Sequence, residues 1–211
     1  TVLTDTDWYT GVPALSSDGQ KLAWVSSANI VIADVVDDKL ENQRTVLERR
    51  SPDTLEWLGD NTLLYSRIVR SPGTEYLELF SLDVTTGQEA QLTEGARAQF
   101  PNAMPDGCIL FLRDLPQEGS MLRTFCDGTI SVFWQAPENT HIVGLDVSRQ
   151  GQILISLWRE GQTDIALLEN NQLTFLTDDE VQDTQPSFES ENEIIFTSNR
   201  DGQYKLYSLN L

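Results

Sequence analysis

The residues that could do chemistry are few, and they exclude several kinds of active site. His141 is the single histidine, and no C-x-x-C or H-E-x-x-H pattern accompanies it. A zinc site needs a larger set of nitrogen and sulfur ligands. A G-x-S-x-G nucleophile elbow is also missing. We therefore expect no catalytic residue and no enzymatic activity. His141 remains a candidate proton switch or ligand, with an ordinary loop histidine as the alternative.

Acidic residues gather beside aromatic ones in the segments that would connect structural repeats. Residues 4–10 contain Asp7, Trp8 and Tyr9, and residues 177–185 contain Asp183. Carboxylates can bind Ca²⁺ or a basic peptide, and exposed aromatic side chains anchor protein interfaces. We expect these four residues and His141 to form one binding face for a cationic peptide or a divalent ion. A solvated acidic rim that only aids solubility is the alternative.

The overall charge narrows the range of partners. The chain has 211 residues, with 33 acidic against 14 basic side chains and a net charge of −19. Binding to nucleic acid needs clustered lysine and arginine, so we expect no nucleic acid partner. No run of 18 apolar residues is present, and we expect no membrane insertion by this domain. Residue 1 is Thr rather than Met, so we expect a processed or excised piece.

A repeat of 41 to 46 residues organises the chain. Five similar stretches begin near residues 13, 55, 101, 145 and 186, and each reads as an apolar residue, a polar turn and an apolar run. Within the second period, the pattern predicts four short strands over residues 55–58, 62–68, 77–84 and 90–93. Four antiparallel strands in each repeat are typical of a β-propeller blade. We therefore predict an all-β, five-bladed propeller that forms a single domain over residues 1–211.

The strand count favours closure of this propeller by the N-terminal segment. The fifth period lacks a fourth strand, whereas Thr1–Thr4 reads "TVLT", similar to "TVLE" at Thr45–Glu48. Thr4 precedes Pro13 by nine residues, as Thr177 precedes Pro186. We predict that Thr1–Thr4 completes the C-terminal blade. A fragment of a larger propeller is the alternative.

Cys108 and Cys126 are the only cysteines, and they flank one predicted hairpin. The hairpin is centred near Gln117, nine residues from each, so the two side chains should face each other across the strand pair. We predict a disulfide, with two unpaired buried thiols as the alternative. Four tryptophans within or beside strands, which we expect to pack inside blades, are Trp24, Trp57, Trp134 and Trp158.

The first and fifth periods resemble the TolB-type propeller repeat. They read "LTDTDWYTGVPALSSDGQKLAWVS" and "LTDDEVQDTQPSFESENEIIFTSNRDGQYKLYSLNL". The repeat in that family runs L-T, about eight residues, P-x-[apolar]-S-x-D-G, an apolar strand and S-x-R-D-G. The third period keeps only "PDG" at residues 105–107, and the second and fourth periods are degenerate.

This resemblance implies a binding or sensing role more than a catalytic one. TolB itself is a periplasmic partner in an envelope system and binds protein segments. Similar propellers gate prolyl-oligopeptidase-like enzymes, and others form periplasmic parts of CadC-like regulators. We therefore expect a protein- or peptide-binding or sensing module in the periplasm of the bacterial envelope. One alternative is the gating propeller of a hydrolase whose catalytic domain is absent. Another is a propeller that binds carbohydrate or a small ligand.

Overall fold

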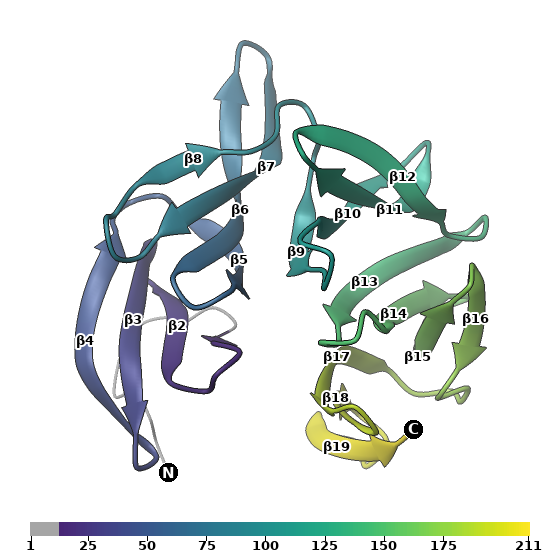
Figure 1. Ribbon diagram of the computed structural model, residues 1–211. Helices are drawn as coiled ribbons and strands as arrows, with labels where there is room; N and C mark the ends of the chain where they lie inside the picture. The colour runs from purple at the N-terminus through teal and green to yellow at the C-terminus, as the bar shows by residue number, and fades with distance from the viewer. Residues whose placement is uncertain (1–12) are drawn as a thin grey trace. The chain divides into compact units, whose positions relative to one another are not determined.

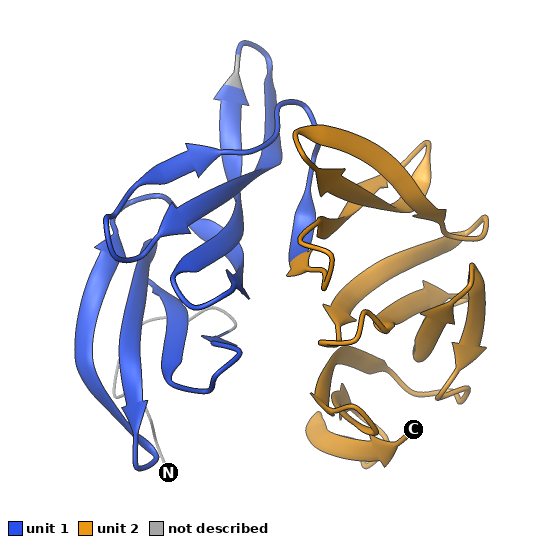
Figure 2. Ribbon diagram, in the orientation of Figure 1, with its two compact units in different colours: residues 1–101 blue, residues 102–211 orange. Residues whose placement is uncertain are grey.

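A computed structural model describes residues 13–211, and it consists of antiparallel sheets that follow one another along the chain (Figure 1). Two compact units divide it, residues 1–101 and residues 102–211 (Figure 2). The organisation as a single domain over 1–211 stays a prediction. Within the described residues no helix is long and apolar enough to span a membrane.

The first unit contains two four-stranded sheets with the strand orders β1-β2-β3-β4 and β5-β6-β7-β8. Their bounds are β1 Ala14–Leu15, β2 Lys21–Ser26, β3 Asn29–Val36, β4 Lys39–Leu47, β5 Pro52–Leu58, β6 Thr62–Ser71, β7 Thr74–Asp83 and β8 Glu89–Gln91.

The third sheet has the order β12-β11-β10-β9, and its strand β9 straddles the boundary between the units. The fourth sheet runs β13-β14-β15-β16, and the fifth has three strands, β17-β18-β19. Their bounds are β9 Gln99–Ala103, β10 Ile109–Leu115, β11 Gly119–Cys126, β12 Thr129–Gln135, β13 Thr140–Val147, β14 Ile153–Arg159, β15 Gln162–Glu169, β16 Gln172–Phe175, β17 Asp183–Ser190, β18 Glu193–Ser198 and β19 Lys205–Asn210.

Tight turns join most of these strands, and their residues fit the backbone they adopt. Asp127 and Gly128 have φ values of 49° and 78° between the paired residues Cys126 and Thr129. Asn170 and Asn171 adopt a similar pair of positive φ values. Two successive positive φ values define the two-residue hairpin turn whose twist matches that of β-strands, and Asn, Asp and Gly adopt it at the lowest cost.

The all-β propeller of five successive antiparallel sheets is confirmed. In the second repeat β6 and β7 are longer than predicted, with ten residues each, and form a long hairpin, whereas β8 is shorter than predicted. The pairing continues from Thr62↔Asp83 to Ser71↔Thr74. The predicted closing strand, Thr1–Thr4, lies outside the described residues.

Apolar side chains between neighbouring sheets form the core of each unit. In the first unit Tyr65 and Phe80 stack with ring centroids 5.6 Å apart, and Trp57 Nε1 donates a hydrogen bond to the Ala14 carbonyl at 3.0 Å. This bond ties the second sheet to the first. In the second unit Ile165 and Phe196 belong to one buried cluster that joins the fourth and fifth sheets.

Close packing of the fourth and fifth sheets depends on Gly144. A Cβ atom at this position would lie 2.5 Å from Ser156 Oγ and 3.2 Å from Pro186 Cδ. The 2.5 Å distance is too short for van der Waals contact, so a larger residue here would displace Ser156 Oγ or press on Pro186 of β17.

Candidate functional site

Asp183, a predicted binding residue, begins β17 and is completely buried. The Arg200 guanidinium donates to both of its carboxylate oxygens, at 3.2 and 3.0 Å. Arg200 also lies over the Tyr207 ring, with its Cζ atom 4.9 Å from the centroid. A ligand could therefore reach Asp183 only by displacing Arg200, and the direct effect of this carboxylate is to hold the arginine in place.

A second arginine repeats this arrangement in the fourth sheet. Arg159, the last residue of β14, pairs with the fully buried Asp164 at 3.2 Å and with the exposed Asp178. The Asp179 N–H also points to Asp164, at 3.4 Å, and Asp179 lies 3.9 Å from Arg200. Two arginines thus connect buried carboxylates to the acidic segment that follows β16.

His141 lies in the same unit and contacts a carboxylate and an aromatic ring. Its Nδ1 atom is 3.3 Å from both oxygens of Asp114, and its ring centroid lies 5.8 Å from that of Trp158. Ser120 Oγ donates to Asp114 at 2.9 Å and accepts a hydrogen bond from the Ile142 N–H. Asp114 is thereby fixed, and it orients the imidazole at the start of β13.

The contacts form two groups, one around His141 and one around the two arginines. Trp158 and Arg159 are successive residues of β14, so their side chains lie on opposite faces of the strand. Each member lies beside the turn between the second and third strands of its sheet, or in the connection that leads into the sheet. We call the two groups together the loop-end network, and its members are Asp114, His141, Trp158, Arg159, Asp164, Asp178, Asp179, Asp183 and Arg200.

The structure therefore places His141 in the first group and Asp183 in the second, with no side-chain contact described between the two groups. Asp7, Trp8 and Tyr9 lie outside the described residues. The expectation that Trp158 packs inside a blade is wrong, since it is 38% exposed and faces His141, whereas the other three predicted tryptophans are buried. Sequence reasoning also missed Arg159 and Arg200. The S-x-R-D-G pattern at residues 198–202 was the available signal for Arg200.

Hydrogen bonds set the charge state at the edge of the network. The Tyr207 hydroxyl donates to Asp201 Oδ2 at 2.7 Å, and this bond, aided by Lys205, lowers the pKa of the Asp201 carboxyl. The same contact raises the pKa of Tyr207. Asp201 is therefore ionised at neutral pH and adds to the negative charge beside Arg200.

A metal ion has no evident ligand set in the described residues. Over residues 13–211 no group of three or more His, Cys, Asp or Glu side chains is placed to hold one. The only cysteines, Cys108 and Cys126, are joined in a disulfide that links the residue before β10 to the last residue of β11. The predicted pairing is thus present in the structure, and neither sulfur is free for a metal.

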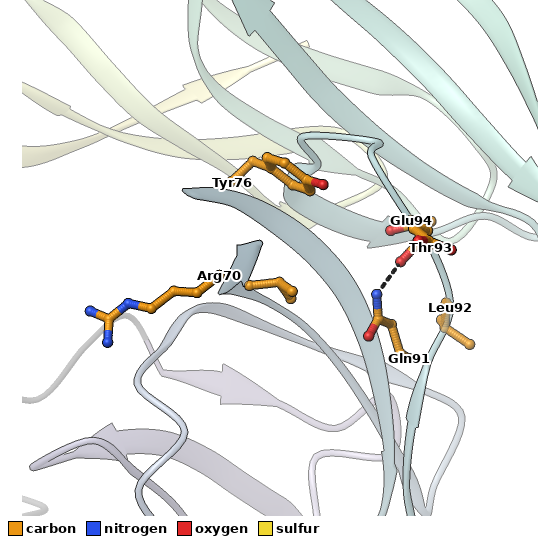
Figure 3. A pocket seen from close by; sticks show the side chains of 7 residues that line it. Arg70, Tyr76, Gln91, Leu92, Thr93 and Glu94 are labelled. Carbon is orange, nitrogen blue, oxygen red and sulfur yellow. Dashed lines mark hydrogen bonds between the residues drawn. The ribbon is translucent and has the colours of Figure 1, made fainter. Parts of the chain in front are cut away.

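The first unit contains a separate cavity of about 500 Å³ beside the long β6–β7 hairpin (Figure 3). Two of its polar side chains are already bonded: Gln91 Nε2 donates to the Thr93 carbonyl at 2.7 Å, and Arg70 pairs with Glu75. Because both side chains are bonded within the chain, they are less available to orient a ligand in the cavity. The residues that line this cavity are Val69, Arg70, Tyr76, Gln91, Leu92, Thr93 and Glu94.

Comparison with known proteins identifies the fold by structure and not by sequence. No protein-family model and no curated protein sequence matches the chain. A solved structure described as TolB from Agrobacterium tumefaciens is 16% identical and has a TM-score of 0.83, with 100% of this chain and 80% of that chain covered.

Two further structures show the same likeness. TolB from Acinetobacter baumannii is 16% identical with a TM-score of 0.72, and this chain covers 56% of its length. The β-propeller domain of the Trilobed protease from Pyrococcus furiosus is 15% identical with a TM-score of 0.65, covering 95% of this chain and 68% of that one. Identities this low establish the fold and leave activity open. The chain has the fold of a TolB-like β-propeller.

Proposed function

We propose that this chain is a non-catalytic propeller module that binds a cationic segment of a protein partner at the loop-end network. The observation that carries this proposal is the bridging by Arg159 and Arg200, each of which joins a buried carboxylate to an exposed one. The side chains of Asp178 and Asp179 are 72% and 47% exposed, yet ion pairs with Arg159 and Arg200 hold them in position. Carboxylates held in place lose less conformational entropy when a partner binds.

The group around His141 supplies a different kind of contact. His141 and Trp158 together present a half-exposed aromatic surface beside Asp114. An aromatic face next to a carboxylate suits the stem and the charge of lysine or arginine. Asp7, Trp8 and Tyr9 belong to the proposed binding face as well, and Asp183 contributes by positioning Arg200.

The proposed location is the bacterial periplasm or another extracytoplasmic compartment. A disulfide such as Cys108–Cys126 persists in oxidising compartments and is rare in the cytosol of most bacteria. The likeness of the fold to TolB supports the same location.

The test is a titration of a labelled peptide of alternating lysine and glycine residues against the wild type and an Asp178→Asn/Asp179→Asn variant. We expect binding that weakens as salt rises, because exposed charges are screened beyond about 8–10 Å. The variant should bind about tenfold more weakly at low salt. Ca²⁺ titrated in parallel tests whether a divalent ion takes the same site.

An Asp37→Asn/Asp38→Asn variant is the matched control, since these neighbouring exposed aspartates lie in the β3–β4 turn of the first unit. It removes the same charge outside the loop-end network and should change the affinity by less than about twofold, because exposed charges outside the site are screened by salt. If both variants weaken binding equally, only net charge matters and the proposed site is wrong.

A second candidate function is the gating propeller of a peptidase, and the likeness to the Trilobed protease propeller favours it. In that case the catalytic groups would lie in a domain outside this chain. A G-x-S-x-G domain encoded in the same gene would support this candidate over the first.

A further inference from the structure

The outer strands of the sheets differ in how they protect their free edges. A free edge presents unpaired backbone N–H and C=O groups, which proteins protect with charge, irregular register or short length. β8 has three residues and β16 has four. β4 has nine, but it carries Lys39, Glu41 and Arg44 and contains two register shifts.

The outer strand of the third sheet, β12, has little of this protection. It runs for seven residues, Thr129–Gln135, without a charged side chain, and in the described part of the chain it pairs with β11 alone (Figure 1). Val132 is 59% exposed and Phe133 is 37% exposed. An uncharged edge with exposed apolar side chains is favourable for the addition of another strand.

A bulge determines which side chains this edge presents. Leu122 pairs with Trp134 and Arg123 with Val132, so Phe133 is an extra residue without a counterpart on β11. A bulge places neighbouring side chains on similar sides of a strand, and this explains why Val132 and Phe133 are both exposed. In an antiparallel hairpin, hydrogen-bonded pairs alternate with pairs that are not hydrogen-bonded, and the pair that flanks a two-residue turn, here Cys126 and Thr129, is hydrogen-bonded. Ile130 and Val132 belong to the other kind of pair, so their backbone N–H and C=O groups point away from β11.

A cavity of about 370 Å³ adjoins this edge within the second unit. Ile153 and Leu168 form its apolar part and are almost fully buried. Glu169 is the single charged residue among those that line it. Within residues 13–211 the buried Oε1 atom of Gln152 accepts no hydrogen bond, although a buried acceptor without a partner is costly. Phe133 lines the cavity as well and thus joins it to the edge of β12.

This lining fits one kind of side chain, a long aliphatic stem with a cationic end. The stem would lie along Phe133, Ile153 and Leu168, and the cation would reach the Glu169 carboxylate and Gln152 Oε1. Lysine and arginine have this chemistry. A neutral apolar side chain would leave the Gln152 oxygen without a donor.

We propose that the free edge of β12 and the adjoining cavity bind an extended, basic segment of a partner protein by strand addition, with one lysine or arginine side chain in the cavity. A second copy of this chain is disfavoured as the occupant, because each copy carries a net charge of −19 and like charges repel. This surface is distinct from the loop-end network, so the proposal goes beyond the proposed function.

The experiment measures binding of the labelled peptide Lys-Val-Lys-Val-Lys-Val-Lys by fluorescence anisotropy, in the Asp178→Asn/Asp179→Asn background. This background removes the contribution of the loop-end network, so failure here is distinguishable from failure of the proposed function. Val132→Pro removes an outward N–H while sparing the pairing with β11, and it should weaken binding by about tenfold or more. Phe133→Ser should also weaken binding of the peptide, and it replaces Val132→Pro in the test if the proline variant does not fold.

The cavity is tested separately with Glu169→Gln, which should weaken binding by about fivefold. Glu191→Gln, an exposed carboxylate in the β17–β18 turn, is its matched control and should have almost no effect. A peptide of the same sequence with every backbone amide methylated should not bind, because it cannot donate hydrogen bonds to the edge.

Equal binding by the wild-type edge and by both β12 variants would overturn the proposal, as would equal binding of the methylated peptide. Analytical ultracentrifugation of the protein alone measures its oligomeric state and so tests whether a second copy of the chain occupies the edge. A dimer that Val132→Pro dissociates would show that β12 pairs with a second copy, and the proposed basic partner would then be wrong.

Discussion

Glu78 and Asp164 occupy the same position in two repeats, and both are completely buried. Each precedes a residue whose N–H donates to the threonine of an L-T pair, Leu79 to Thr93 Oγ1 at 3.0 Å and Ile165 to Thr177 Oγ1 at 2.9 Å. The partners of the two carboxylates differ. Glu78 accepts from the Thr93 hydroxyl and the Ala96 N–H, whereas Asp164 pairs with Arg159.

This difference separates a buried carboxylate that fixes a local loop from one that also holds part of the proposed binding surface. The neutral donors around Glu78 only fix the local loop after β8. Arg159 also reaches the exposed Asp178, so the buried Asp164 helps to position the acidic surface. A buried carboxylate that needs a cation is sensitive to loss of its charge, whereas one held by neutral donors is less so.

β19 extends the comparison, because Leu206 occupies the repeat position of Leu79 and Ile165. Those two side chains are buried, but Leu206 is 74% exposed and the nearby Tyr204 is 62% exposed. In the described residues β19 pairs with β18 alone. We predict that Thr1–Thr4 supplies the fourth strand beside it and shields its apolar side chains from water, in the position that β8 has beside β7 and β16 has beside β15.

Deletion of residues 1–6 should therefore have the largest effect on stability. Covering two large apolar side chains contributes about 3 kcal/mol or more, equivalent to a decrease of about 10 °C in Tm for a chain of this size. Differential scanning calorimetry measures this decrease in Tm. A variant with Gly-Ser repeats in place of residues 1–6 controls for length and should melt like the deletion. A Tm equal to that of the full chain would contradict the closure.

The next effect concerns the two buried carboxylates directly. Asp164→Asn leaves an amide against Arg159 and should lower the free energy of unfolding by about 2 kcal/mol. Glu78→Gln keeps an acceptor for the Ala96 N–H and should cost less than about 1 kcal/mol. Urea denaturation monitored by tryptophan fluorescence measures both. Equal losses would show that the cation beside Asp164 makes no special contribution.

The sequence predicted well what depends on local spacing. The five repeats follow from turn residues and alternating apolar runs, and the position of Cys108 and Cys126 follows from the centre of one hairpin. Interactions between distant segments were missed. The burial of Asp183 depends on Arg200, 17 residues away, and acidic residues in a polar connection are normally expected in solvent. The bulge at Phe133 also had no visible signal, because one extra residue does not interrupt an apolar run.

Asp146 separates the effect of burial from that of a cation, and its substitution should have the smallest effect. Its Oδ2 atom accepts a hydrogen bond from the Phe188 N–H at 2.7 Å. Burial raises the pKa of this carboxyl, and bonds from Phe188, Val147 and Ser187 oppose the increase only in part. A carboxyl with a raised pKa in the folded state binds more protons there than in the unfolded state. Stability therefore falls as the pH rises from the unfolded pKa through the folded one.

Asp146→Asn removes this loss, since the amide oxygen can still accept from Phe188 and no charge is buried. We expect the variant to match the wild type near pH 3, where the aspartate is protonated, and to exceed it at pH 7 by about 1 kcal/mol or less. Thermal melts from pH 3 to pH 7 measure the difference between the two proteins. A variant that is less stable than the wild type at pH 7 would mean that Asp146, like Asp164, depends on its charge. Burial alone would then not distinguish carboxylates that tolerate an amide from those that require a cation.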